Sequence, residues 1–352
     1  MEGCLSLKKK NLDHKNSLQQ NLDPDPGDSY QLPLFDMTWE CPTGCVSATL
    51  VGVLSVTLAV AQVPGPDGFS TFSDHAALDT PKSAQGSCRT WTAAAAGGVM
   101  LGTFALLDQA WYAKYDRSPL HSFDDVGEWL QMDKAGHMFS AYTLGGWGHA
   151  GWRRCGTSNR EAIVIGGGLG FLFLTGVEVL DGTSSGWGFS WSDMAANAVG
   201  TGLFMGQQAG WGEQRIQVKL SAHPTSYADQ RPDVLGEGLG ERILKDYNGQ
   251  TIWLSANLWS FQKASSLPEW LSVGFGYSAE GMISAFPQDA EHADIDERYR
   301  QYFLSPDIDL TRIRTKSKVL RTVLFVLNGV KVPMPALEFR SNGRVLAHGL
   351  YF

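Results

Sequence analysis

The chain has 352 residues, of which 43% are hydrophobic and 18% are charged, and its formal net charge is −8 at pH 7. This composition excludes a long disordered polymer and a transporter buried almost wholly in a membrane. The chain is acidic and has no stretch of alternating basic and aromatic residues that could bind a phosphate backbone. Nucleic acid is therefore not expected as a partner. Glycine, with 40 residues, and tryptophan, with 12, are abundant. Together they indicate close helix packing or contact with lipid.

The N-terminal part of the chain is interpreted as a leader. Residues 1–36 are polar, and we expect them to be disordered because they contain too few apolar residues for a core. An apolar run begins at Val46 and ends in the small residues 59–61, the form of a signal-peptide cleavage site. We therefore interpret residues 1–61 as a disordered leader and cleaved signal peptide, with a retained membrane anchor as the alternative, and residues 62–88 as a linker.

Five cysteines are present, and three of them precede the expected cleavage site. Cys88 and Cys155 would then stay in the mature protein. In an exported protein these two could form a disulfide. Two free, buried thiols fit the sequence equally well.

Residues 89–213 are expected to form a four-helix unit rich in small residues. The expected helices cover residues 90–115, 128–152, 160–180 and 192–211. Ala162–Leu180 carries one formal charge and is long enough to cross most of a bilayer's hydrocarbon core. Its glycines, within residues 166–170, would let neighbouring backbones come close. A buried helical bundle is the alternative, but we favour contact with a membrane.

Residues 214–352 change to a period of two and are expected to form a strand-rich unit with one helix. The expected strands cover residues 215–222, 251–259, 270–277, 299–314 and 344–352, and the helix covers residues 316–330. Five or six strands are too few for a closed transmembrane barrel, which begins at eight. We therefore predict the α+β class, with a four-helix membrane-associated unit followed by a small antiparallel sheet partly covered by helices.

Ionisable residues recur one helical turn apart in the second, third and fourth expected helices. Unpaired ionisable groups are costly in a membrane or a dry core, so they usually face one another or a wet cavity. The sequence therefore predicts one polar cluster, formed by Asp133, Lys134, His137, Glu178, Asp181, Asp193 and Asn197.

Three kinds of chemistry fit this cluster. His137 and Asp133 could be a general base and its supporting carboxylate, although no serine or cysteine lies in a nucleophile-elbow context. His137 and the carboxylates could bind a divalent metal, but Lys134 in the same motif favours a cation that is already present. We favour the third, a satisfied network that fixes the helix register. We accordingly expect no metal and no cofactor, and the sequence does not decide whether the protein is an enzyme.

Residues 129–137, together with the later cluster residues, resemble an uncharacterised family of predicted periplasmic lipoproteins of unknown function. The resemblance extends from Trp111 to the C terminus and implies an envelope location without an established activity. The chain departs from the family's name because no lipidation cysteine follows its apolar leader. A second, shorter resemblance is to the VanZ-like membrane proteins, which are linked to glycopeptide resistance. It consists of three elements in the same order: a D-K-x-x-H motif, an acidic residue and a D-x-x-x-N-x-x-G motif.

We therefore expect an exported, membrane-associated protein of the cell envelope with a structural or lipid-binding role. The alternative is an enzyme that acts on an envelope lipid or lipid-linked glycan with His137 as general base. Membrane lipid is the expected partner, and other envelope proteins are further candidates. The strands and the terminal Phe352 favour the outer membrane over the inner one by a small margin, although the apolar third helix favours the inner.

Overall fold

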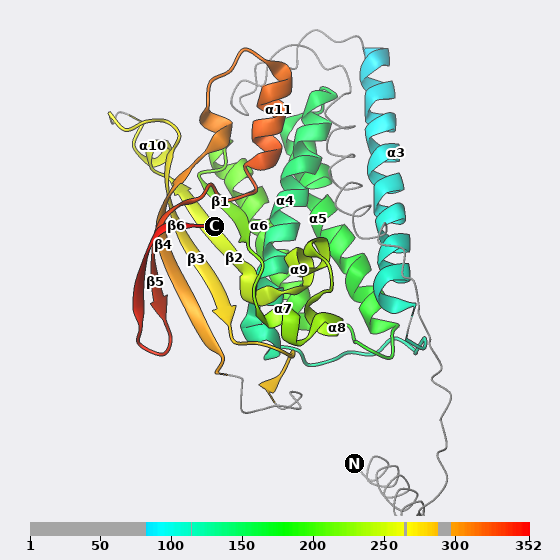
Figure 1. The fold of residues 1–352 in the computed structure, drawn as a ribbon. Helices are drawn as coiled ribbons and strands as arrows, with labels where there is room; N and C mark the ends of the chain where they lie inside the picture. The colour runs from blue at the N-terminus through cyan, green and yellow to red at the C-terminus, as the bar shows by residue number, and fades with distance from the viewer. Residues whose placement is uncertain (1–81, 114, 264–265, 288–296) are drawn as a thin grey trace, which may run out of the picture. The chain divides into compact units, whose positions relative to one another are not determined.

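The computed structural model describes residues 82–113, 115–263, 266–287 and 297–352. The expected leader, its cleavage site and most of the linker lie outside these residues. Within the described part of the chain, a helical region precedes a six-stranded antiparallel sheet (Figure 1). The predicted α+β class is confirmed.

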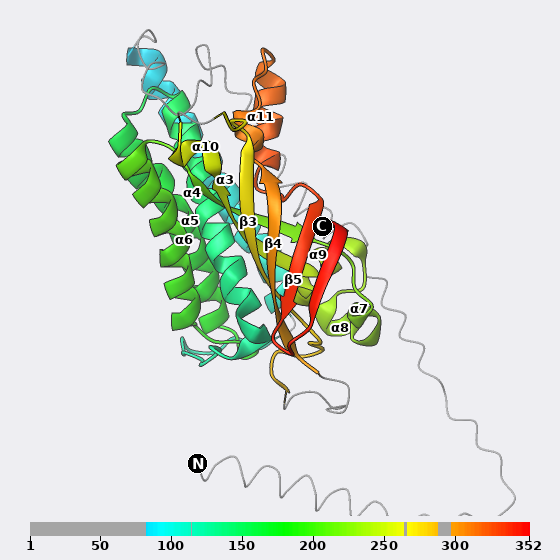
Figure 2. The ribbon, with the colours of Figure 1, turned by 90° about the vertical axis from the view of Figure 1, so that its left-hand side faces the viewer.

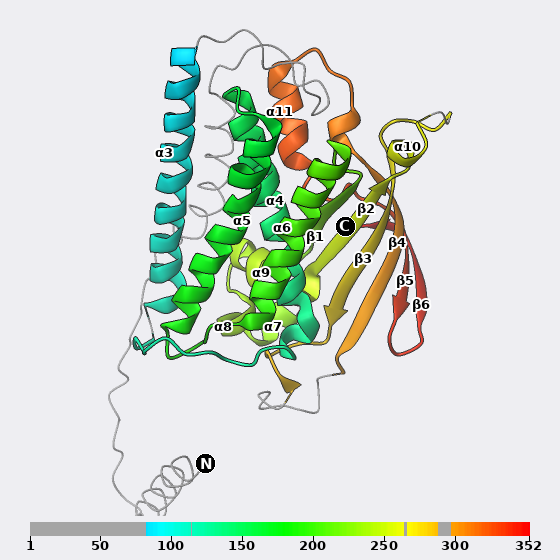
Figure 3. The same cartoon turned by 180° about the vertical axis from the view of Figure 1, so that it is seen from behind.

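The helical region contains the four helices expected from the sequence. They are α3 (Lys82–Leu107), α4 (Met132–Arg154), α5 (Asn159–Gly182) and α6 (Trp191–Trp211). Helices α4, α5 and α6 pack closely on one another, and α3 lies beside them (Figures 1 and 3). Helix α3 begins inside the expected linker, because this segment lacks proline and contains good helix formers.

Glycines allow the backbones of α4, α5 and α6 to approach. A Cβ atom on Gly166 of α5 would lie 2.4 Å from the backbone nitrogen of His149 in α4. A Cβ atom on Gly200 of α6 would lie 2.2 Å from the carbonyl oxygen of Met138. Since no side chain fits at such distances, these positions require glycine, as the small-residue pattern predicts.

A disulfide ties α3 to the rest of the helical region. Cys88 in α3 is bonded to Cys155, which follows the last turn of α4, and their Cα atoms are 5.4 Å apart. Of the two states that the sequence allows, the structure contains the disulfide. Disulfides persist mainly in oxidising compartments, so this bond is consistent with export.

The sheet is an antiparallel meander in which each strand pairs with the next. The strands are β1 (Ile216–Ala222), β2 (Gln250–Asn257), β3 (Leu271–Glu280), β4 (Tyr299–Ile308), β5 (Met334–Arg340) and β6 (Val345–Tyr351). Strand β5 was not predicted, because Pro335 lies inside it and proline is unusual in strands. Strand β4 is shorter than predicted, since a 3-10 turn at Leu310–Arg312 follows it.

Short helices connect several strands. Helices α7 (Tyr227–Gln230), α8 (Pro232–Leu235) and α9 (Leu239–Lys245) lie between β1 and β2, and α10 (Leu258–Phe261) follows β2. Helix α11 (Lys318–Leu327) precedes β5 and confirms the helix predicted there. In Figure 2, strands β3 to β5 lie in front and helices α4 to α6 lie to one side.

One face of the sheet is polar and buried. Its side chains include Lys219, Ser255, Asp307 and Glu338, each exposed by 1% or less. The ammonium of Lys219 lies 2.7 Å from a carboxylate oxygen of Asp307. The ammonium of Lys331 lies over the ring of the buried Trp253, near the same carboxylate. The interior of this part of the protein is therefore held by ion pairs and hydrogen bonds as well as apolar packing.

The opposite face of the sheet is apolar. One row of paired residues crosses four strands and consists of Leu254, Phe275, Leu304 and Leu337. All four side chains are exposed, Phe275 by 59%. This face is covered along β1 and at one end of β2 and β3, where Val218, Ile252 and Ala279 join a core with side chains of α4 and α6.

Candidate functional site

The predicted polar cluster lies where three helix ends meet. Asp133, Lys134 and His137 belong to the first two turns of α4, and Glu178 belongs to the end of α5. Asp193 and Asn197 belong to the first two turns of α6. These helix ends lie at the lower end of the helical region in Figure 1.

Lys134 is the cationic centre of one half of the cluster. Its Nζ atom lies 2.6 Å from Oδ2 of Asp125, 2.6 Å from Oδ2 of Asp133 and 3.3 Å from Oδ1 of Asp193. Burial alone would lower the pKa of Lys134, but the carboxylates raise it above its ordinary value. Burial also raises the pKa of Asp133 to about 7, against the effect of the Lys134 ammonium.

Asp125 is a cluster residue that the sequence analysis missed. It follows a segment that pairs with the connection between α5 and α6, where the amide of Phe123 donates to the carbonyl of Phe189. Its Oδ1 atom accepts hydrogen bonds from the hydroxyls of Ser190, at 2.7 Å, and Ser192, at 2.6 Å. Burial opposes ionisation, but hydrogen bonds from Lys134 and both serines lower the pKa of Asp125 to about 2.

His137 is the centre of the other half of the cluster. Its Nδ1 atom lies 3.1 Å from Oδ1 of Asn197, and this amide oxygen accepts a hydrogen bond in the tautomer that carries the proton on Nδ1. Its Nε2 atom faces Oε1 of Glu178 at 3.7 Å and Oδ2 of Asp193 at 3.8 Å. Both distances are too long for hydrogen bonds. The carboxylates opposite His137 are therefore Glu178 and Asp193, whereas Asp133 is held by Lys134.

Glu178 and Asp181 have different surroundings although they lie one turn apart. Oε2 of Glu178 accepts a hydrogen bond from the amide of Ser190 at 3.0 Å. Its Oε1 atom has no hydrogen-bond partner within the described part of the chain, and the residue is only 1% exposed. Asp181 accepts a 2.7 Å hydrogen bond from the hydroxyl of Tyr112, a second residue that was missed. Asp181 therefore lies at the edge of the cluster.

A left-handed turn connects the cluster to the sheet. Trp129, Leu130 and Gln131, directly before α4, have φ angles of 46°, 50° and 68°, which side chains rarely adopt. The hydroxyl of Tyr277 in β3 donates to the carbonyl of Leu130, and Arg300 in β4 donates to the Gln131 side chain at 2.7 Å. Contacts with the sheet therefore fix the start of α4, and with it Asp133 and Lys134.

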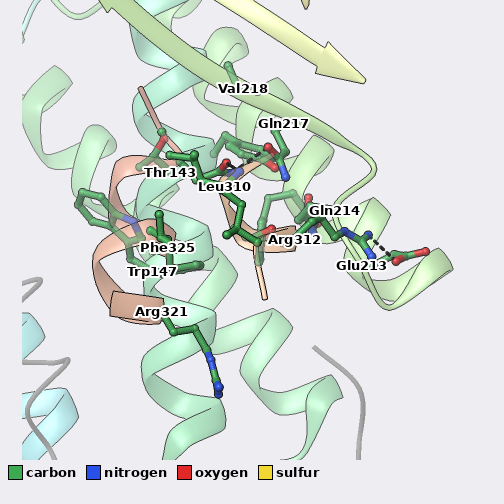
Figure 4. Close-up of a pocket in the computed structure, with 17 residues that line it drawn as sticks. Thr143, Trp147, Glu213, Gln214, Gln217, Val218, Leu310, Arg312, Arg321 and Phe325 are labelled. Atoms are coloured by element: carbon green, nitrogen blue, oxygen red, sulfur yellow. Dashed lines mark hydrogen bonds and ion pairs between the residues drawn. The ribbon is translucent and has the colours of Figure 1, made fainter. Parts of the chain in front are cut away.

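A pocket with a volume of about 120 Å³ lies between α4, α6 and α11 (Figure 4). Trp147 and Phe325 line one side of it, and Arg312 pairs with Glu213 at 2.8 Å on the other. Small-molecule sites usually have about 300 Å³ or more, and Arg312 and Glu213 here already bind each other. The polar cluster is therefore the stronger candidate site.

Comparison with known proteins gives one match. Residues 122–206 match the model of a family described as predicted periplasmic lipoprotein (DUF2279). This stretch contains all seven predicted cluster residues and Asp125, but it is shorter than the resemblance expected from Trp111 to the C terminus. No curated protein and no solved structure matches the chain. The similarity to VanZ-like proteins stays a prediction.

The family description supports a protein of the cell envelope and assigns no activity. It agrees with the disulfide between Cys88 and Cys155.

Proposed function

We propose that this envelope protein is membrane-associated and contacts lipid through its exposed apolar surfaces. These are the uncovered part of the apolar face of strands β2 to β6 and the exposed sides of helices α3 and α5. The observation that carries the proposal is the reversed sheet, whose polar face is buried while its apolar face is exposed. The proposed role is structural or lipid-binding, with membrane lipid as the partner and other envelope proteins as further candidates.

The sheet has its polar side chains on the buried face and its apolar side chains on the exposed face, as a lipid-facing sheet does. An antiparallel sheet in a soluble protein commonly buries its apolar face and exposes its polar one. Here Phe275, Tyr302, Leu337 and Phe339 are exposed by 43–59% on neighbouring strands. Contiguous exposed apolar residues mark contacts with proteins or membranes, and lipid-facing strands have apolar outer and polar inner residues.

Two helices provide further exposed apolar surface. Residues Gln85–Leu107 of α3 and Asn159–Gly182 of α5 are long and apolar enough to cross a membrane. Only 6% of the most apolar stretch of α3 and 33% of that of α5 is buried, which disfavours two core helices of a soluble protein. The exposed side chains include Trp91 and Leu101 of α3 and Val164 and Leu172 of α5.

The sheet is expected to rest against lipid rather than to cross it. Within the described residues, β1 and β6 do not pair with each other, so the sheet has an open edge. Open edges are not tolerated in the hydrocarbon core because their backbone groups find no hydrogen-bond partners. The two long apolar helices are the better candidates for deep insertion.

Vesicle flotation tests the lipid contact. We expect the full-length protein to float with phospholipid vesicles after detergent removal, and the double variant Phe275→Glu/Leu337→Glu to float less. Charged side chains are costly at a lipid contact, whereas both positions are already exposed, so the fold should survive. Asn342→Glu, in the exposed turn between β5 and β6, is the matched control. Equal flotation of the double variant and wild type would contradict the contribution of the sheet.

The outer membrane is the proposed location, by a small margin over the inner membrane. The alternation of polar inner and apolar outer residues supports it, whereas the apolar helix α5 supports the inner membrane. In a density gradient of total membranes, we expect the protein to sediment with outer-membrane markers. Sedimentation with inner-membrane markers would reverse the assignment.

An enzyme acting on an envelope lipid or lipid-linked glycan, with His137 as general base, is the second candidate. The specific observation in its favour is the contact between Nδ1 of His137 and Oδ1 of Asn197, because the tautomer that donates there has a bare Nε2. The His137 side chain is also 20% exposed. His137→Ala, which removes the hydrogen-bonding ring, separates the two functions. An enzyme would lose turnover of extracted envelope lipids at unchanged stability, whereas a structural network would lose stability.

A further inference from the structure

The polar cluster is divided into two sets of converging oxygen and nitrogen atoms. One set consists of carboxylate oxygens of Asp125, Asp133 and Asp193, and the Lys134 ammonium lies among them. The other set consists of one atom each from His137, Glu178 and Asp193, and all three lie within 4.8 Å of one another. Lys134 therefore supplies the positive charge for the first set, and it reaches the second set only through Oδ1 of the shared Asp193.

We propose that His137 Nε2, Glu178 Oε1 and Asp193 Oδ2 bind one divalent transition-metal ion. This inference concerns the second set only, and it does not depend on the proposed lipid contact. The sequence alone favours charge balance by Lys134 without a metal. The structure limits what Lys134 can balance, because its ammonium contacts Asp125, Asp133 and Oδ1 of Asp193 but no ion pair joins it to Glu178 among the described residues.

The distances between the three atoms suit a metal better than direct hydrogen bonds. Nε2 of His137 is 3.7 Å from Oε1 of Glu178 and 3.8 Å from Oδ2 of Asp193. Metal–ligand bonds of about 2.0–2.2 Å in a tetrahedral arrangement place neighbouring ligands about 3.3–3.6 Å apart. A movement of a few tenths of an ångström would therefore bring Nε2 of His137 to the spacing that neighbouring metal ligands have, relative to each carboxylate oxygen.

The orientation of His137 also suits a metal ligand. In the tautomer with the proton on Nδ1, this N–H donates to Oδ1 of Asn197, and the lone pair of Nε2 is directed toward the two carboxylates. A hydrogen bond on the remote nitrogen is the usual way in which a protein orients a histidine ligand. Without a cation or a second proton on the ring, this lone pair would face negative charge.

Glu178 provides an independent sign of a missing partner. Its side chain is 99% buried, since 1% is exposed, and Oε1 accepts no hydrogen bond within the described residues. A buried, unpartnered carboxylate oxygen is costly, and nearly all such atoms in proteins have a partner. Nε2 of His137 lies 3.7 Å from this oxygen. A metal ion between them would satisfy both atoms.

The donor types indicate the class of ion. One imidazole nitrogen with two carboxylate oxygens suits zinc and related transition metals, whereas magnesium and calcium prefer oxygen ligands alone. Three protein ligands leave at least one position for water, as in catalytic rather than structural zinc sites. The 20% exposure of the His137 side chain provides access from solvent.

Metal titration of the purified full-length protein tests the proposal. The protein is freed of any affinity tag, treated with a chelator and titrated with Zn²⁺ alone. We expect one zinc ion per chain and a rise in the melting temperature on zinc addition. Glu178→Gln and Asp193→Asn should each weaken zinc binding by about tenfold or more. Asp181→Asn, one turn from Glu178 but bonded to Tyr112, is the matched control and should bind as the wild type does.

Cobalt provides a readout on the wild type, so the test does not depend on the folding of a variant. Co²⁺ bound to the second set should give visible absorption bands of a low-coordinate site, which His137→Gln should abolish or shift. A zinc content near zero in the wild type, or equal affinity in the wild type and Glu178→Gln, would overturn the proposal. Displacement of zinc by an equal concentration of Mg²⁺ would overturn the assigned class of ion.

Discussion

Replacing Lys134 by methionine is expected to lower the free energy of unfolding by about 3–5 kcal/mol, the typical effect of breaking a buried ion pair from one side. The Lys134 side chain is 12% exposed, and its ammonium lies among Asp125, Asp133 and Asp193. Methionine has a similar length but no charge, so these carboxylates would stay buried without their cation. Thermal unfolding of the purified protein, followed by circular dichroism, measures the loss.

Two variants serve as comparisons for Lys134→Met. Lys263→Met removes a 56% exposed ammonium that pairs with Glu213, and we expect a loss below about 1 kcal/mol because surface ion pairs contribute little. His137→Gln keeps a hydrogen-bonding side chain and should have a smaller effect than Lys134→Met. Wild-type stability in Lys134→Met would show that the carboxylates do not depend on this ammonium.

Replacing Gly166 by alanine is expected to destabilise the helical region by about 1–3 kcal/mol, the usual effect of overpacking. The added Cβ atom would lie 2.4 Å from the backbone of His149, so α4 and α5 would have to separate. Gly168→Ala in the same helix is the control, because its Cβ atom would meet nothing within 4 Å. Since alanine favours helix more than glycine does, Gly168→Ala should be neutral or stabilising by up to about 1 kcal/mol.

Thermal unfolding followed by circular dichroism also measures the stability of the two glycine variants. Equal melting temperatures for Gly166→Ala and Gly168→Ala would mean that the close contact between α4 and α5 does not limit stability.

The sequence predicts most of the helical region because the patterns that indicate a helix involve residues close together in the chain. The small-residue pattern identifies α3 to α6, and the one-turn spacing of Asp193 and Asn197 places both on one side of α6. The contacts within the cluster could not be predicted in this way. Asp133 and His137 lie one turn apart, yet Lys134 holds Asp133, and His137 faces Glu178 from another helix.

Residues outside regular helices were missed for a related reason. Asp125 reaches the cluster from a connecting segment, and Tyr112 reaches it from a π-helical turn after α3. Neither position belongs to a periodic pattern. Only the tertiary pairing of the connecting segment with the region between α5 and α6 brings Asp125 to Lys134.

The sheet shows a different limit of sequence analysis. Alternation of polar and apolar residues predicts two faces, but it does not say which of them faces the interior. In this protein, Lys219 and Asp307 occupy the buried face, while Phe275 and Leu337 occupy the exposed one. That reversal appears only when the strands are assembled, and it carries the proposed contact with lipid.

Fluorescence quenching by lipid is the most direct test of that contact. A bimane label is attached through Phe275→Cys in the full-length protein, which is reconstituted into vesicles that contain lipids brominated on their acyl chains. We predict that brominated lipid quenches this label and has little effect on a label attached through Asn342→Cys in the exposed turn. Equal, weak quenching at both positions would show that the apolar face of the sheet does not contact acyl chains, and would contradict the account.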